Sequence, residues 1–221
     1  MNLASRYNAI PGISLGTKLF LHLRWLLTPY SDMSNYVPTV GRVLDVGCGH
    51  GLLAMKMALS APGREVLATD HDEQRIEVAR LAGAGIDNLQ FEVSTGSPVQ
   101  GGNGPEAVGT FDAIMMIDFL HYFSPEEQDS MIRQAFAKLT PGGWLLAREV
   151  DQHTGLLSKI NQLYEKLATW TAFTQTKAVD TMTFRSQPEW EAKFAEHGFK
   201  VHAKRCSSPI FEDILFICEK G

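Results

Sequence analysis

The chain has 221 residues, of which 44% are hydrophobic, and this length and composition fit one globular domain around one core. Its formal net charge of −5 argues against nucleic acid as a partner, because nucleic-acid-binding faces need clustered Lys and Arg. The three cysteines form no metal-ligand cluster, and we expect free thiols in a reducing cytoplasm. The sequence thus predicts a cytoplasmic protein that needs neither nucleic acid nor a metal.

The first 31 residues differ in charge from the rest of the chain. They contain Arg6, Lys18 and Arg24 but no acidic residue, whereas every Asp and Glu lies further on. Residues 16–28 predict a helix with an apolar face, but they are fewer than the roughly 20 residues that cross a bilayer. Such a helix could act as a lid over an apolar site or contact an anionic membrane surface peripherally, and the two roles are compatible.

A glycine-rich turn at residues 43–51 joins an apolar strand to a helix and reads Val-Leu-Asp-Val-Gly-Cys-Gly-His-Gly. Gly47, Gly49 and Gly51 carry no Cβ atom, so a ligand can lie close against the backbone there. Asp45, at the end of the strand, offers an acceptor to a cationic or hydroxylated group. The segment therefore predicts a ligand-binding turn.

A second apolar run, residues 65–69, ends in Asp70, which lies 19 residues beyond Gly51. A carboxylate at this point can accept both hydroxyls of a ribose, so a nucleoside is the expected ligand. Dinucleotide sites favour G-x-G-x-x-G around a pyrophosphate, whereas this chain has G-x-G-x-G preceded by Asp45. An acid at that point repels a pyrophosphate and suits the ammonium of a methionine moiety. This disfavours the alternative of a nicotinamide-dependent dehydrogenase.

The sequence here resembles the class I S-adenosylmethionine-dependent methyltransferases of the small-molecule type. Four motifs carry the resemblance, in order and at normal spacing: residues 44–51, Asp70 with His71, residues 111–122 and residues 139–146. The last two match the family's fourth strand with the turn that follows it, and the later turn together with the fifth strand.

The resemblance implies an α/β, Rossmann-like fold with a seven-stranded, mostly parallel sheet and helices on both faces. Residues 199–204 and 214–218 are expected to be its closing strands, with the last one antiparallel, after a helix at 189–197. Relatives commonly lay an N-terminal helix across the cofactor. We therefore expect a helical lid segment at 1–40 and an S-adenosylmethionine-binding domain at 41–221.

The expected cofactor is S-adenosylmethionine, but one motif departs from the family pattern. Many relatives place Gly-Asp after the third strand, with the acid accepting from the adenine amino group, whereas this chain has Ser94 and Thr95. A hydroxyl accepts such a bond more weakly than a carboxylate. The residues expected at the cofactor are Asp45, Gly47, Cys48, Gly49, Gly51, Asp70, His71, Ser94, Thr95, Asp118 and Phe119.

Two candidate catalytic residues, Asp118 and His121, flank the turn after the fourth strand, at the edge where open α/β sheets bind ligands. At three-residue spacing in a helical turn they can point the same way. His121 can act as a base, since histidine titrates near neutrality, although packing at the helix start is the competing interpretation. Asp118 is expected to contact the methionine end of the cofactor.

Candidate substrate-binding residues lie outside the motifs. Glu149, Asp151 and His153 alternate along the fifth strand and would share one face if it stays extended, but we expect no metal there, because the resemblance is to metal-independent members. The residues expected at the substrate are Tyr7, Trp25, Tyr122, Glu149 and His153.

The function expected from this resemblance is methyl transfer to a small apolar or aromatic acceptor, with oxygen as the favoured atom. N- or C-methylation stays open, because a fold fixes the cofactor far better than the acceptor. A different class of protein, one that keeps the cofactor pocket without catalysing transfer, is the other alternative.

Overall fold

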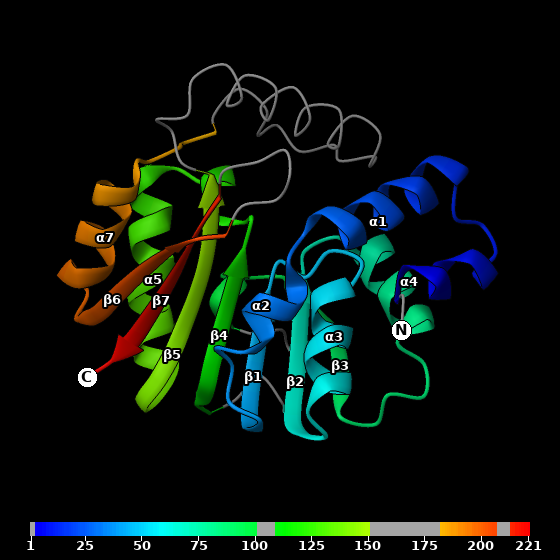
Figure 1. Cartoon of the computed structure of the whole chain (residues 1–221), viewed down its shortest axis with the longest axis horizontal. Coiled ribbons are helices and arrows are strands. Elements are labelled where there is room, and N and C mark those ends of the chain that lie inside the picture. The colour runs from blue at the N-terminus through cyan, green and yellow to red at the C-terminus, as the bar shows by residue number, and fades with distance from the viewer. Residues whose placement is uncertain (1–2, 101–108, 151–181, 207–212) are drawn as a thin grey trace.

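A computed structural model describes residues 3–100, 109–150, 182–206 and 213–221. Its centre is a seven-stranded sheet in the order β3-β2-β1-β4-β5-β7-β6 (Figure 1). The five strands from β3 to β5 are parallel, whereas β7 runs antiparallel to both of its neighbours. The strands are β1 (Val40–Val46), β2 (Gly63–Asp70), β3 (Leu89–Val93), β4 (Phe111–Ile117), β5 (Leu139–Val150), β6 (Phe199–Arg205) and β7 (Asp213–Lys220). The predicted seven-stranded, mostly parallel sheet is confirmed.

Helices cover both faces of this sheet, as expected (Figure 1). The core on one face joins α1, α2, α3 and α4, and the core on the other joins α5 and α7. The α-helices are α1 (Leu15–Leu27), α2 (Tyr30–Ser34), α3 (Leu52–Ser60), α4 (Glu73–Ala82), α5 (Pro125–Lys138) and α7 (Gln187–Glu196). Short 3₁₀ helices are η1 (Leu3–Ala9), η2 (Pro98–Gln100) and η4 (Leu120–Tyr122). None of the described helices is long and apolar enough to cross a bilayer.

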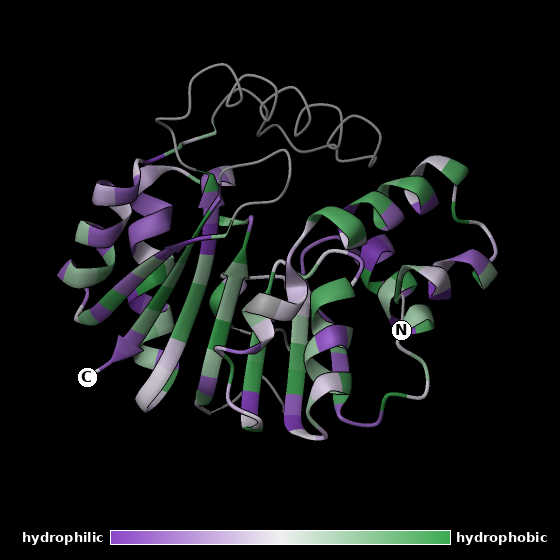
Figure 2. Cartoon of the chain, in the orientation of Figure 1, coloured by the Kyte–Doolittle hydropathy of each residue, from purple (hydrophilic) through white to green (hydrophobic). Residues whose placement is uncertain are grey.

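The sheet has two buried faces because the carboxyl-terminal halves of its central strands are mostly apolar (Figure 2). In β4, Ala113 and Met115 pack toward the α3 and α4 side, whereas Ile114 and Met116 pack toward α5. Successive strand residues point to opposite faces, so one continuous apolar run serves both cores.

Local sequence signals set the helix ends more finely than periodicity does. The helix expected at 189–197 is α7, which begins at Gln187 because Ser186 and Glu189 form a capping box and a proline occupies the first turn. The turn and the fifth strand are expected within 139–146, and in the structure β5 begins at Leu139 itself. The Pro-Gly-Gly stretch lies inside β5, where the pairing of β5 with β4 is irregular. Gly142 in this stretch has a φ of 74°.

The order of the strands places a ligand site beside β1 and β4. These two adjacent strands connect onward to opposite faces, since α3 follows β1 on one face and α5 follows β4 on the other. Ligands in open α/β sheets bind outside the carboxyl ends of the strands at such a switch point.

Candidate functional site

A cavity of about 660 Å³ lies at this carboxyl edge. Its wall is built from the ends of β1, β2 and β4, from the loop after β3, and from residues of α1 and α5. The predicted site residues that line it are Asp45, Gly47, Cys48, Gly49, Asp70, His71, Ser94, Asp118, Phe119 and Tyr122. The structure therefore brings together most of the residues expected at the cofactor.

The three glycines of the turn have different surroundings, although φ is positive at each. A Cβ at Gly47 would overlap the Phe119 ring, and one at Gly51 would lie 2.6 Å from Phe91, on the protein side of the turn. A Cβ at Gly49 would meet no protein atom within 4 Å, because that position faces the cavity. Gly49 is thus the glycine whose bare backbone a ligand can reach, and Gly51 serves packing.

Two carboxylates lie side by side in the wall of the cavity. Asp70 accepts hydrogen bonds from the backbone N–H of Gly49, at 2.8 Å, and of Asp72, at 3.0 Å. Asp45 is 2% exposed, and its Oδ2 has no hydrogen-bond partner within the described part of the chain. Burial, and next to it the charge of Asp70, raises the pKa of Asp45 to about 7. A cationic group in the cavity would compensate this buried carboxylate.

Other polar groups in the wall are held neutral or face outward. Burial, followed by the charge of Arg75, lowers the pKa of His50 to about 4, so its imidazole is uncharged at neutral pH. Burial also raises the pKa of the Cys48 thiol, which keeps it a thiol and a poor nucleophile. Ser94 lines the cavity, whereas Thr95, also expected at the cofactor, is exposed and lies outside the described lining.

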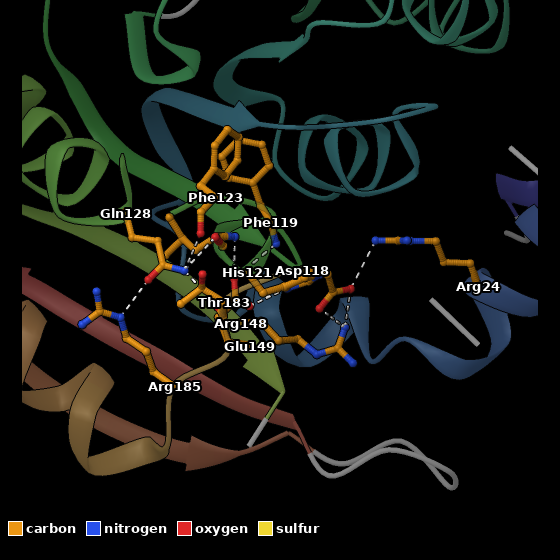
Figure 3. Close-up of polar contacts among 11 residues, drawn as sticks. Arg24, Asp118, Phe119, His121, Phe123, Gln128, Arg148, Glu149, Thr183 and Arg185 are labelled. Carbon is orange, nitrogen blue, oxygen red and sulfur yellow. Dashed lines mark hydrogen bonds and ion pairs between the residues drawn. The ribbon is translucent and has the colours of Figure 1, made fainter. Parts of the chain in front are cut away.

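Asp118 is the one non-glycine residue with positive φ, 55°, within the described ranges. Arg148 donates from one guanidinium nitrogen to both of its oxygens, each at 3.0 Å, and also contacts Asp213. Arg24 donates to Asp118 from the opposite side at 3.2 Å (Figure 3). Because Arg24 belongs to α1, this contact ties the N-terminal helix to the end of β4.

His121 and Glu149 form a buried pair behind this turn rather than part of the described lining. Each side chain is 1% exposed, and the Nδ1 atom of His121 lies 2.7 Å from Glu149 Oε2. Glu149 also accepts the backbone N–H groups of Phe119 and Leu120, at 3.2 and 2.7 Å (Figure 3). The His121 ring stacks on Phe184 at 5.3 Å. Glu149, expected at the substrate, lies outside the described lining, and two backbone N–H groups and the His121 ring contact its carboxylate.

Two other residues expected at the substrate also face the interior. Tyr7 is fully buried and donates its hydroxyl to the backbone oxygen of His50. Trp25 packs on Tyr30, with ring centroids 5.6 Å apart, and lies outside the described lining. The apolar segment before the turn thus contributes packing where direct contact was expected. His153 and Asp151 lie outside the described residues.

Sequence reasoning missed several residues of the wall. Arg24 reaches the cavity from α1, and Gln134 reaches it from α5. The spacing of Glu127, Ser130 and Gln134 along a helix was the available signal for α5, since positions three, four and seven apart share a face. No local signal marked Arg24.

Residues 44–145 match the family model described as a methyltransferase domain. By this match, which covers 102 of the 221 residues, the segment is similar to a methyltransferase domain. The match spans the glycine turn, Asp70, β4 and the start of β5, the same elements that build the cavity.

Known proteins similar to this chain include a curated relative and two solved structures. The ubiquinone biosynthesis O-methyltransferase of Chromobacterium violaceum is 33% identical over 116 residues, 51% of this chain and 45% of the relative. The match thus spans about half the length of that relative. An O-methyltransferase family protein from Burkholderia thailandensis has a TM-score of 0.71 at 19% identity, covering 98% of this chain and 62% of its own.

The second solved structure is the magnesium protoporphyrin IX methyltransferase of Synechocystis, determined with bound SAH. It has a TM-score of 0.67 at 14% identity and covers 99% of this chain and 93% of its own. At these identities the likeness shows the fold that the chain shares with both structures.

Proposed function

We propose that the chain transfers a methyl group from S-adenosylmethionine to a small apolar or aromatic acceptor, with oxygen as the favoured atom. The observation that carries this proposal is the meeting of Gly49, Asp70 and the buried carboxylate of Asp45 in one cavity. The glycine admits a ligand, one acid suits a ribose, and the other suits a cation.

The residues present fit such a cofactor. Asp70 already accepts two backbone N–H groups, and its oxygens have lone pairs left for ribose hydroxyls. Asp45 would face the cationic methionine end, and the Phe119 ring offers an apolar surface to the base. Bound there, S-adenosylmethionine would supply an electrophilic methyl group on a sulfonium. The chain's own task is to align the acceptor and exclude water.

The acceptor class is inferred from the apolar part of the wall. Phe20, Tyr30 and Tyr122 line the cavity together with the cofactor residues, and aromatic walls suit planar apolar molecules. The relatives named as O-methyltransferases support oxygen as the acceptor atom. N- or C-methylation and cofactor binding without catalysis are the alternatives.

We also propose that residues 1–40 act as a lid over this site. The α1 helix places Phe20, Leu21 and Arg24 on the cavity, although it lies far from the other wall residues in sequence. Leu21 is 1% exposed and belongs to the core, which anchors the helix over the edge of the sheet.

The outer face of α1 supports the further proposal of contact with an anionic membrane. Leu15, Leu19, Leu23 and Leu26 recur at helical spacing and are 84, 62, 40 and 76% exposed. They belong to a segment with three basic residues and no acid, in a chain of net charge −5. An apolar stripe in a basic segment fits an interfacial helix on acidic lipids.

Calorimetry with S-adenosylmethionine, followed by turnover, tests the main proposal. We expect binding to the wild type and a loss of roughly tenfold to a hundredfold for Asp70→Ala, because a charge-assisted hydrogen bond is lost. Asp87→Ala, at an exposed aspartate on the opposite edge of the sheet, should bind like wild type.

Release of S-adenosylhomocysteine is then measured with a panel of phenols, catechols, amines and activated carbon acids. Turnover with a hydroxyl acceptor supports the proposal, and turnover with an amine or carbon acid alone reassigns the acceptor atom. Binding without turnover across the whole panel would favour the non-catalytic alternative.

A further inference from the structure

One face of α5 forms a polar strip along the cavity. Glu127, Ser130 and Gln134 lie on it with Met131, at spacings of three, four and seven residues. Ser97, which follows β3 in the chain, meets this strip: its hydroxyl lies 2.6 Å from Gln134 Oε1. The amide nitrogen of Gln134 donates in turn to Ser130 at 3.1 Å. Gln134 thus sits between two hydroxyl groups at the cavity wall.

The same region is where the family's adenine-binding acid is missing. Position 95 carries a threonine, which is exposed and lies outside the described lining of the cavity. Glu127, the carboxylate of the strip, already accepts the N–H of Ser124 in the capping box of α5. Beside the hydroxyls of Ser94 and Ser97, the amide oxygen of Gln134 is an acceptor that this part of the wall offers to a donor on the cofactor's base.

We infer that Gln134 recognises the adenine base of the cofactor, an inference that rests on the proposed function. Adenine presents an amino donor beside a ring-nitrogen acceptor, and a glutamine amide presents the complementary acceptor and donor. The amide oxygen has two lone pairs and the amide nitrogen two N–H groups. Ser97 and Ser130 use one of each, which leaves one acceptor and one donor for the base.

The two serine contacts also give the site a preference for adenine over hypoxanthine. Hypoxanthine carries a carbonyl where adenine has its amino group and an N–H where adenine has a ring acceptor. Gln134 could serve it only by rotating its amide by half a turn. That rotation would set the amide N–H groups against Ser97 and the oxygen against Ser130, and both serine hydroxyls would have to reorient.

Calorimetry with two probes, S-adenosylhomocysteine and its deaminated analogue S-inosylhomocysteine, tests this inference. We expect wild type to prefer the adenosyl probe and Gln134→Ala to lose roughly 5-fold to 100-fold of that affinity. The same variant should bind the inosyl probe about as wild type does, so the preference collapses. Gln90→Ala, at an exposed glutamine of β3, should keep it.

A second variant tests the inference if Gln134→Ala fails to fold. Ser97→Ala removes the hydroxyl that orients the amide and should narrow the preference by weakening the adenosyl probe and strengthening the inosyl probe. Unchanged adenosyl affinity in Gln134→Ala, or an equal loss for both probes, would overturn the inference. If wild type binds neither probe, the proposed cofactor itself is wrong.

Discussion

Arg24 on α1 and Asp118 at the end of β4 form an ion pair of 3.2 Å across 94 positions of sequence. The side chains are 34 and 18% exposed, so the pair is screened by solvent and is worth only about 0–1 kcal/mol. Asp118 is held more firmly from its other side by Arg148, which is 4% exposed. The contact from α1 is therefore the weaker of the two ion pairs of Asp118, which is consistent with the proposed lid role of residues 1–40.

Removing this contact should change ligand exchange more than stability. We expect Arg24→Ala to leave the midpoint of thermal unfolding nearly unchanged and to speed dissociation of S-adenosylhomocysteine, measured by stopped-flow displacement. Arg133→Ala, at an exposed arginine of α5, controls for the lost charge. An unchanged dissociation rate would show that α1 does not act as a lid through this pair.

The glycine turn permits a sharper test, because its positions differ in what a side chain would meet. Gly49→Ala adds a methyl group that clashes with no protein atom, so it should fold with only the strain of positive φ, about 1–2 kcal/mol, yet bind cofactor poorly. Gly142→Ala carries similar strain, with φ of 74° and open space, but lies away from the cavity. Calorimetry on both variants should show an affinity loss at Gly49 alone.

Such local features explain how much could be predicted from the sequence. Gly49 and Asp70 could be predicted, because both lie within one strand–turn–helix unit and the strand that follows it, at a recognisable spacing. The structure places both on the cavity. Glu149 was expected at the substrate but lies outside the described lining. Alternation along a strand indicates which residues share a face, but not which face is covered. Arg24 and Gln134 were missed, because their nearness to the turn depends on how α1 and α5 pack.

The buried carboxylate of Asp45 should make cofactor affinity depend on pH. Its pKa of about 7 means that it is mostly protonated at pH 6 and mostly charged at pH 8. Affinity for a cationic ligand should therefore rise with pH through about 7, and Asp45→Asn should bind weakly with a flatter profile. Calorimetry at pH 6, 7 and 8 measures this, and His71→Gln controls for the exposed imidazole nearby.

The carboxylate of Asp45 should make the stability of the unliganded protein fall as pH rises, whereas cofactor affinity should increase. Its pKa is higher in the folded chain than the ordinary value of 3.8, so folding favours the protonated form. The empty protein should lose stability as pH rises from about 4 through 7, and Asp45→Asn should raise its unfolding midpoint more at pH 8 than at pH 6. An equal effect at both values would contradict the raised pKa.

The leucine stripe of α1 predicts binding to acidic vesicles. Wild type should co-sediment with vesicles of phosphatidylcholine and phosphatidylglycerol more than with phosphatidylcholine alone, and added salt should weaken the binding. Leu15→Ser with Leu19→Ser should abolish it, whereas Leu81→Ser, at a leucine of α4 that is 55% exposed, should not. If light scattering instead finds a dimer that the double variant disrupts, the stripe is an interface between copies of the chain.

Variants of the buried residues His121 and Glu149 distinguish a catalytic base from a positioning role. Glu149 holds the N–H groups of Phe119 and Leu120 as well as the imidazole, so it fixes the turn that presents Phe119 to the cavity. Glu149→Ala should cost about 1–3 kcal/mol of stability and weaken cofactor binding, because buried donors lose their acceptor. Glu149→Gln should retain part of both, since its amide oxygen can still accept from the backbone.

His121→Asn then decides whether the ring moves a proton. A base would lower the transfer rate by roughly 10² to 10⁴ and remove the rise of rate with pH. With a side chain only 1% exposed and engaged by Glu149, we expect instead a smaller loss at saturating substrate and an unchanged pH profile, measured as S-adenosylhomocysteine release. Loss of the pH-dependent limb in the variant would restore His121 as the base. An unchanged profile would favour an acceptor that needs no deprotonation or a base elsewhere in the chain.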